Sequence, residues 1–412
     1  MSSSAKSLTE GPLAKQILLV SLPLVLSNLL QVLFNMSDVA VVGRFAGSTA
    51  LGSVGSTSIF VTLFTGFLIG LSNGINVLVA RFYGARHADD VEKTVHSALL
   101  VSLAAGVLLL LIGLLGSPAL LHLLNTKEDL YPGAVLYLRV YFLGMPALAL
   151  YNYGNAIFSA IGETKKPLYY LCIAGALNIL LNYMLIFGKW GAPAMGCAGA
   201  AVATLISRVF EVVVVLGCML WGRRLPVKPD LMVRPGRIIA GDFIRYSLPV
   251  VLNEGMWSLA MSLFSIIMGH MPNSTPILAA YTIAGNIDRM AAVALFASGN
   301  TAAVIIGREI GCGDTEEVYG KGVALNFVCF VTGVVSMGIL LVIRATLLDS
   351  FIFPLMDISA EAGDMAKMML AFIAAIMPLR SLNLCNIVGV FRGGGDVNYA
   401  LKVDIGPLYC IC

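Results

Sequence analysis

Four oxygen-bearing side chains lie inside long apolar runs of this chain, where polar groups are costly. Asp38 precedes Arg44 by six residues, so in a helix it would lie about 9 Å below the end of its run. Asn178 and Asn182 are four residues apart and would share one helical face, and Thr204 falls at a similar depth in the next run. Carboxylate, amide and hydroxyl oxygens suit a hard cation or a proton relay, so these residues are predicted to form a cation or proton site. The alternatives are an ion pair with Arg44 and hydrogen bonding between helices.

A second carboxylate, Glu254, lies near the middle of another apolar run. It follows Arg245 by nine residues, which in a helix corresponds to about 13 Å. We expect it to form a second protonatable or cation-recruiting site, and we assign it with Asn253 and Asn286 to substrate binding. The alternative is a helix-packing carboxyl group that is held neutral.

The composition predicts the helices that must position these residues. Of the 412 residues, 58% are hydrophobic and only 12% are charged, and the mean hydropathy is +0.89, which excludes an ordinary water-soluble enzyme. About 20 apolar residues span a bilayer as a helix. The sequence therefore predicts an all-α polytopic membrane protein whose spans lie near 15–42, 50–80, 94–121, 134–160, 167–188, 197–221, 243–269, 276–306, 321–343 and 364–391.

The distribution of positive charge predicts the orientation. Most Lys and Arg residues of the connections fall on the same side as the N-terminus, which predicts a cytoplasmic N-terminus. We expect the protein in the plasma (inner) membrane. The net charge of +3 is small and scattered, so no nucleic-acid partner is expected. We expect a monomer in the lipid bilayer, with a cytoplasmic tail, an N-terminal lobe, a cytoplasmic linker and a C-terminal lobe at 1–14, 15–222, 223–242 and 243–412.

An internal repeat is the most informative pattern in the sequence. The matched positions keep their order along the chain, and their separation only grows, as insertions in loops would cause. They are Ser21-Leu22-Pro23 with Ser247-Leu248-Pro249, Gly43 with Gly269, Arg81 with Arg308, Gly84 with Gly311, Gly106 with Gly333, Pro146 with Pro378, and Gly162-Glu163 with Gly395-Asp396. Both halves begin on the cytoplasmic side, so two parallel six-helix lobes around a central cavity are predicted, which is a transporter architecture.

The repeat also predicts a missing segment. The partner of the span at 197–221 would lie beyond Cys412. We therefore expect the second lobe to be truncated in span eleven, with twelve spans in intact relatives.

The motifs together resemble those of the multidrug and toxic compound extrusion (MATE) transporters over nearly the whole chain. The resemblance is carried by Ser21–Pro23, Asp38–Gly43, Asn178–Tyr183, Phe187-Gly188, Gly199–Thr204 and Phe391–Asp396. It implies a two-lobed antiporter that exports cationic amphipathic compounds in exchange for Na⁺ or H⁺, without a bound cofactor.

The resemblance also implies roles for single residues. Asp38 falls on the family's carboxylate of the first helix, and Asn178, Asn182 and Thr204 fall on the polar positions grouped with it. Some branches have Asp at the position of Asn182, which leaves the choice between Na⁺ and H⁺ open. Glu254 is similar to the family's acidic residue of the seventh helix, although it lies about one turn closer to Pro249 than that residue does to its proline.

Other function classes have less support in the sequence. A flippase for lipid-linked precursors or polysaccharides shares a similar fold but would need a more cationic cavity, for which only Arg208, Arg289 and Arg380 are available. Asp288 and Arg289 are expected to pair with other groups between helices. A transport-inactive truncated membrane protein is a further alternative. No ATP-binding loop and no hydrolase motif occurs, so an enzyme is not predicted.

Overall fold

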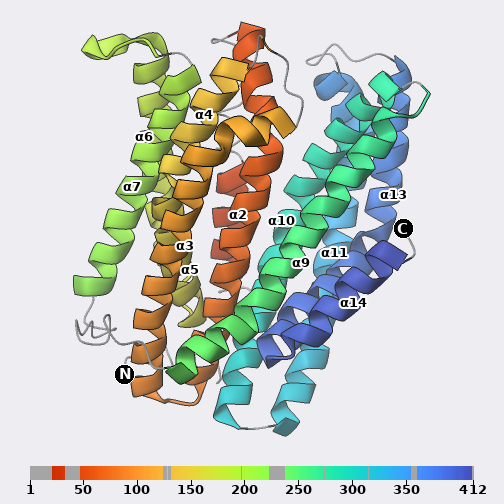
Figure 1. The fold of residues 1–412 in the computed structure, drawn as a ribbon. Helices are drawn as coiled ribbons and strands as arrows, with labels where there is room; N and C mark the ends of the chain where they lie inside the picture. Colours follow the sequence, from red (N-terminus) through yellow and green to blue (C-terminus); the bar gives the residue numbers. More distant parts are fainter. Residues whose placement is uncertain are drawn as a thin grey trace. The chain divides into compact units, whose positions relative to one another are not determined.

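The computed structural model describes residues 21–32, 47–123, 128, 131–195, 197–221, 237–272, 274–313, 315–353 and 360–410, which form helices and connections without a β-strand (Figure 1). Within these ranges seven helices are long and apolar enough to cross a membrane, and one bent pair of helices makes an eighth. The prediction of an all-α polytopic membrane protein is confirmed.

The chain forms two compact units. The N-terminal unit, residues 30–255, contains α2 (Gly47–Gly84), α3 (Ala88–Leu123), α4 (Tyr131–Leu143), α5 (Met145–Ala160), α6 (Lys165–Phe187), α7 (Cys197–Trp221) and the first part of α9 (Arg237–Gly269). Its main core lies between α2, α3, α5 and α7, around the fully buried Ile75, Tyr153 and Ile157. Helix α6 packs chiefly against α7, as Figure 1 shows.

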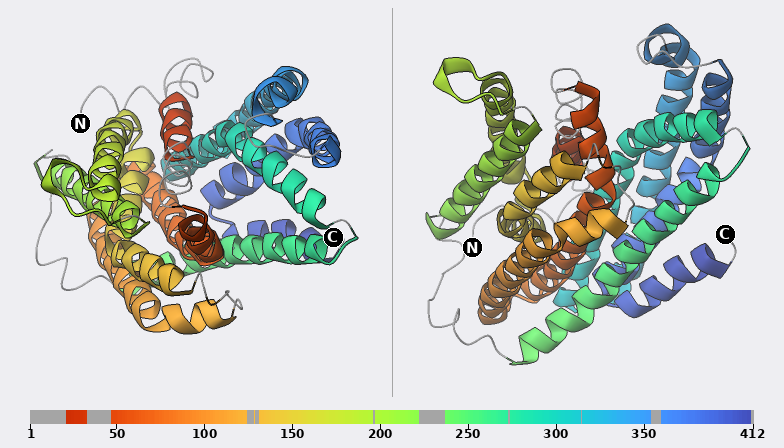
Figure 2. Two further views of the ribbon diagram at one scale, coloured as in Figure 1. Left: turned by 90° about the horizontal axis from the view of Figure 1, so that it is seen from above. Right: turned by 45° about the horizontal axis from the view of Figure 1, so that its top comes forward.

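The C-terminal unit consists of residues 1–29 and 256–412. Besides the rest of α9, it contains α10 (Ser274–Cys312), α11 (Thr315–Val342), the π-helical segment Ile343–Ile352, α13 (Ala360–Leu384), the π-helical segment Cys385–Arg392 and α14 (Val397–Cys410). Helices α10, α11 and α13 pack on one another around Leu295, Leu340 and Leu370 (Figure 2). The lobe boundaries predicted from the sequence stay a prediction.

Most predicted spans correspond to one continuous helix that extends a few residues into the polar connections. The span predicted at 134–160 differs, because it consists of α4 and α5, which meet at an angle of 44°. Pro146 has no backbone N–H to donate to the preceding turn, so the helix breaks at Gly144, whose N–H bonds the Tyr141 carbonyl at 3.0 Å.

The predicted repeat reappears as the same contact in both units. A side-chain Cβ at Gly106 on α3 would lie 2.7 Å from the Pro146 Cα, and one at Gly333 on α11 would lie 2.7 Å from the Pro378 Cα. Glycine at these positions lets two helix backbones approach closely. Two matched pairs of the repeat, Gly106 with Gly333 and Pro146 with Pro378, therefore lie at equivalent close approaches of two helices.

The turns that follow these helices repeat as well. Gly162 and Gly395 both have positive φ, at 77° and 90°. The next residue donates its N–H to an equivalent carbonyl in each unit, from Glu163 to Phe158 at 2.8 Å and from Asp396 to Phe391 at 2.9 Å. The match of Gly162-Glu163 with Gly395-Asp396 thus reflects one left-handed turn formed twice.

The outward faces of the long helices are apolar. On α3, the exposed fractions of Leu108, Leu111 and Leu115 are 56%, 50% and 81%. Neighbouring leucines that expose half or more of their surface are unfavourable in water and are typical of a lipid-facing surface.

Candidate functional site

The predicted amide and hydroxyl residues lie together in the N-terminal unit, between α6 and α7. Asn178 and Asn182 are buried on one face of α6, and Asn182 Nδ2 donates to Asn178 Oδ1 at 3.1 Å. Asn178 Nδ2 in turn donates to Thr204 Oγ1 on α7 at 3.4 Å, and the Thr204 hydroxyl donates to the Ala200 carbonyl at 3.0 Å. The three side chains form one chain of hydrogen bonds across the helix interface. Interhelical bonding, the alternative considered above, is thus present between Asn178 and Thr204, whereas the bond from Asn182 to Asn178 lies within α6.

A charged pair lies farther along the same helix. Arg208 Nη1 donates to Glu211 Oε2 at 2.8 Å, and the exposed fraction of the Glu211 side chain is 1%. The Arg208 guanidinium also lies 5.6 Å from the centre of the Tyr151 ring on α5, a cation–π distance. The Tyr151 hydroxyl accepts a hydrogen bond of 3.1 Å from Gln31 Nε2. Within the described residues, Glu211 Oε1 is buried without a hydrogen-bond partner.

Residues of both groups form one row of polar side chains on α7, called here the polar seam. Thr204, Arg208 and Glu211 follow one another at spacings of four and three residues, so they lie on the same face of the helix. The polar seam extends along about 10 Å of the helix axis. It binds α6 through Asn178 and α5 through Tyr151. Thr204 and Arg208 are half-buried and Glu211 is buried. A polar seam of this kind can carry a proton or a desolvated cation through an otherwise apolar helix bundle.

Glu211 was missed by the sequence analysis, which considered Arg208 alone. The signal was present, because a carboxylate three residues after an arginine in an apolar run is placed to pair with it. Asp38, the central residue of the predicted ion site, lies outside the described residues.

The predicted substrate-binding residues lie on α9 and α10. Asn253 is buried, with an exposed fraction of 2%, whereas its neighbour Glu254 is half-buried. Both belong to the N-terminal unit, and Asn286, which is exposed on α10, belongs to the C-terminal unit. Their grouping in one binding site stays a prediction.

The charged residues of α10 bear out the expected pairing between helices for Asp288. Arg380 Nη1 on α13 lies 2.7 Å from Asp288 Oδ1 and 2.9 Å from Oδ2. Arg289 is exposed. In the same unit, Trp257 Nε1 on α9 donates to Asp404 Oδ2 on α14 at 3.0 Å. Across the part of the chain that the structure describes, no three His, Cys, Asp or Glu residues gather as metal ligands.

Comparison with known proteins adds a family. The family model MatE matches residues 23–184 and 249–406. The probable multidrug resistance protein YoeA of Bacillus subtilis is 28% identical over 316 residues, which cover 74% of this chain and 67% of that protein. The probable multidrug resistance protein NorM of Thermotoga maritima is 26% identical over 306 residues, or 74% of this chain and 65% of the relative. The chain therefore matches about two thirds of the length of these curated relatives.

Solved structures share the fold. One, described as an outward-facing conformation of a multidrug resistance MATE family transporter of the MOP superfamily, superposes with a TM-score of 0.89 at 21% identity, over 99% of this chain and 90% of that one. A MOP superfamily transporter from Pyrococcus furiosus, described as having a binding pocket of reverse polarity, superposes with a TM-score of 0.88 at 21% identity, over 99% of this chain and 90% of that one.

Proposed function

This chain belongs to the MatE family, and from that premise we propose that it is a secondary antiporter that exports cationic amphipathic compounds in exchange for Na⁺ or H⁺. The observation that carries the proposal is the polar seam on α7 of the N-terminal unit, from Thr204 to the buried Glu211. Within a membrane-spanning bundle, polar side chains of this kind are costly and mark ion pathways.

The arrangement of charge favours a cation over an anion as cargo. An anionic cargo needs arginine side chains that are free to bind it. Arg208 is bound by Glu211 and Arg380 is bound by Asp288, so two of the three arginines that a flippase for anionic headgroups would need already have carboxylate partners. Glu254, half-buried on α9, supplies a negative charge that would attract a cation.

We place the coupling ion with Asp38 and the hydrogen-bonded group of Asn178, Asn182 and Thr204. Neutral amide and hydroxyl oxygens can replace part of the hydration shell of a bound ion, and one carboxylate supplies the compensating charge. A proton on the carboxylate would serve the same purpose.

The test is accumulation of a fluorescent lipophilic cation in cells that lack their own efflux pumps. We expect the wild-type chain to lower dye accumulation relative to an empty vector, and Asp38→Asn to abolish this effect at equal membrane abundance. Asp90→Asn is the matched control, because Asp90 is 40% exposed at the start of α3 and pairs only with nearby residues on its own segment, His87 and Lys93, within the described structure.

Proteoliposomes would then identify the ion. Dye movement driven by an imposed Na⁺ gradient, or by an imposed pH gradient, assigns the coupling. If dye is not excluded by a chain that is demonstrably in the membrane, or if Asp38→Asn transports as well as the wild type, the proposal is wrong.

A further inference from the structure

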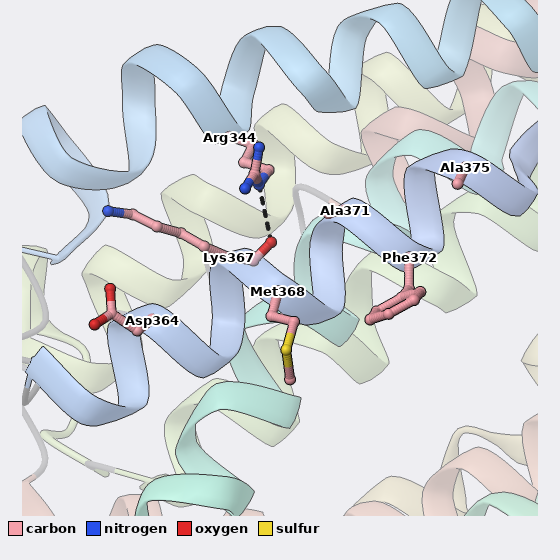
Figure 3. A pocket seen from close by; sticks show the side chains of 7 residues that line it. All are labelled: Arg344, Asp364, Lys367, Met368, Ala371, Phe372 and Ala375. Atoms are coloured by element: carbon pink, nitrogen blue, oxygen red, sulfur yellow. Dashed lines mark hydrogen bonds between the residues drawn. The ribbon is translucent and has the colours of Figure 1, made fainter.

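A pocket of about 530 Å³ lies in the C-terminal unit, where the end of α11 and its π-helical continuation meet the beginning of α13 (Figure 3). It is separate from the polar seam of the N-terminal unit. Its lining combines charged and apolar side chains: Arg344, Asp364, Lys367, Met368, Ala371, Phe372 and Ala375.

Arg344 is anchored through one nitrogen of its guanidinium group. Its Nε donates to the Lys367 carbonyl at 2.9 Å, which Figure 3 shows as a dashed line. Among the described residues, no acceptor binds its two terminal nitrogens. The Lys367 ammonium, in contrast, is 2.7 Å from Asp349 Oδ1 and lies over the Phe353 ring. Arg344 is therefore the cation of this pocket that can bind a ligand, and a guanidinium fork suits a phosphate.

Asp364 supplies a negative charge to the same pocket. It is exposed, and it forms no ion pair with another described residue. A purely anionic ligand would be repelled by this carboxylate. Arg344 and Asp364 line the same pocket and carry opposite charges, so a ligand with both a phosphate and an ammonium group complements the lining better than a purely anionic one.

The remaining lining is apolar and faces outward. The exposed fractions of Met368 and Phe372 are 56% and 67%, and Figure 3 shows both on the same stretch of α13 as Asp364. The pocket lies near one end of the two apolar spans Glu317–Ser350 and Ala360–Arg392. Charged groups near a span end beside exposed apolar side chains match the boundary between lipid headgroups and acyl chains.

We propose that this pocket binds a phospholipid with an ethanolamine headgroup. The phosphate lies against the Arg344 guanidinium, the primary ammonium lies against the Asp364 carboxylate, and an acyl chain covers Met368 and Phe372. The inference is independent of the transported substrate and of the coupling ion.

The test is native mass spectrometry of the purified full chain with phosphatidylethanolamine and phosphatidylglycerol at equal concentration. We expect the wild type to retain phosphatidylethanolamine preferentially. Arg344→Gln should weaken retention of both lipids by about tenfold, since loss of a charge-assisted hydrogen bond is of that order. Asp364→Asn should remove the preference for phosphatidylethanolamine and raise retention of phosphatidylglycerol.

Two exposed charged residues outside the pocket provide matched controls, Lys402→Gln on α14 and Glu361→Gln on α13, which should bind like the wild type. Asp364 is exposed, so its variant is expected to fold even if Arg344→Gln does not. Equal retention of both lipids by the wild type, or a preference for phosphatidylglycerol that Asp364→Asn leaves unchanged, would overturn the proposal.

Discussion

Polar residues inside the N-terminal unit bind partners on the same helix and on neighbouring helices. Asn178 bonds Thr204 across the interface of α6 and α7, and Arg208 contacts Glu211 and the Tyr151 ring. Each contact offsets the penalty of placing a polar group among apolar side chains. The penalty returns in full when one partner is removed, which makes these residues suitable for measurement.

The pair Arg208–Glu211 gives a prediction of unequal effects. Glu211→Gln leaves a guanidinium that cannot lose its charge, and we expect it to destabilise the protein by about 3–5 kcal/mol, the usual effect of breaking a buried pair. Arg208→Gln should be milder, because a carboxylate without its partner can bind a proton and become neutral. The apparent melting temperature of the purified protein measures both.

The double variant Arg208→Met with Glu211→Leu is the control for the pair. Replacing both charges with apolar side chains should restore most of the stability that Glu211→Gln loses. Equal melting temperatures for Glu211→Gln and the wild type would show that the ion pair contributes nothing to the fold.

At the scale of helices, glycines decide how closely the backbones approach. Gly333 on α11 faces α13, and an added Cβ would lie 2.7 Å from Pro378 Cα and 2.9 Å from the Met377 carbonyl oxygen. Gly338 lies on the same helix with nothing within 4 Å of its added Cβ. Both glycines lie inside α11, so they differ in their contacts with other helices but not in the type of backbone structure around them.

Gly333→Ala is therefore expected to destabilise the protein by about 1–3 kcal/mol, because the helices must move apart. Gly338→Ala should be neutral or stabilising by up to about 1 kcal/mol, because alanine favours a helix. Thermal unfolding of the two variants in the same detergent compares them directly. Gly106→Ala should match Gly333→Ala, since Gly106 contacts Pro146 in the same way. A similar melting temperature for Gly333→Ala and Gly338→Ala would contradict this account of the interface.

At the scale of the whole molecule, the positive-inside rule predicts how the chain crosses the membrane. Helix α3 has 36 residues and is roughly 50 Å long, which is enough for its two ends to lie on opposite sides of a bilayer core of about 30 Å. His87 and Glu128 are exposed in the connections at these two ends. From the excess of Lys and Arg we expect the His87 end to lie in the cytoplasm.

Labelling of single cysteines tests this orientation. In a variant whose eight native cysteines are replaced, a membrane-impermeant maleimide should label Glu128→Cys in intact cells. It should label His87→Cys only after the cells are broken. The reverse pattern would invert the predicted topology, and labelling of both in intact cells would show that α3 does not separate the two compartments.

Much of the architecture could be read from the amino-acid sequence. Apolar runs of about 20 residues determine the helices, because a backbone in lipid must satisfy its own hydrogen bonds. The repeated glycines and prolines identified equivalent positions, and their contacts proved equivalent. Asn178 and Asn182 were assigned to one face from their spacing alone, and their hydrogen bond confirms it. These features depend on local period and composition.

The tertiary structure alone decided which distant groups meet. Arg380 pairs with Asp288 across 92 residues of sequence, and the pocket of Arg344 and Asp364 forms only where α11 meets α13. The bend between α4 and α5 and the contact of Arg208 with the Tyr151 ring were likewise visible only in the tertiary structure. Periodicity specifies which face of a helix is polar, but the partner of that face depends on how helices pack, and packing is set by side chains from several segments at once.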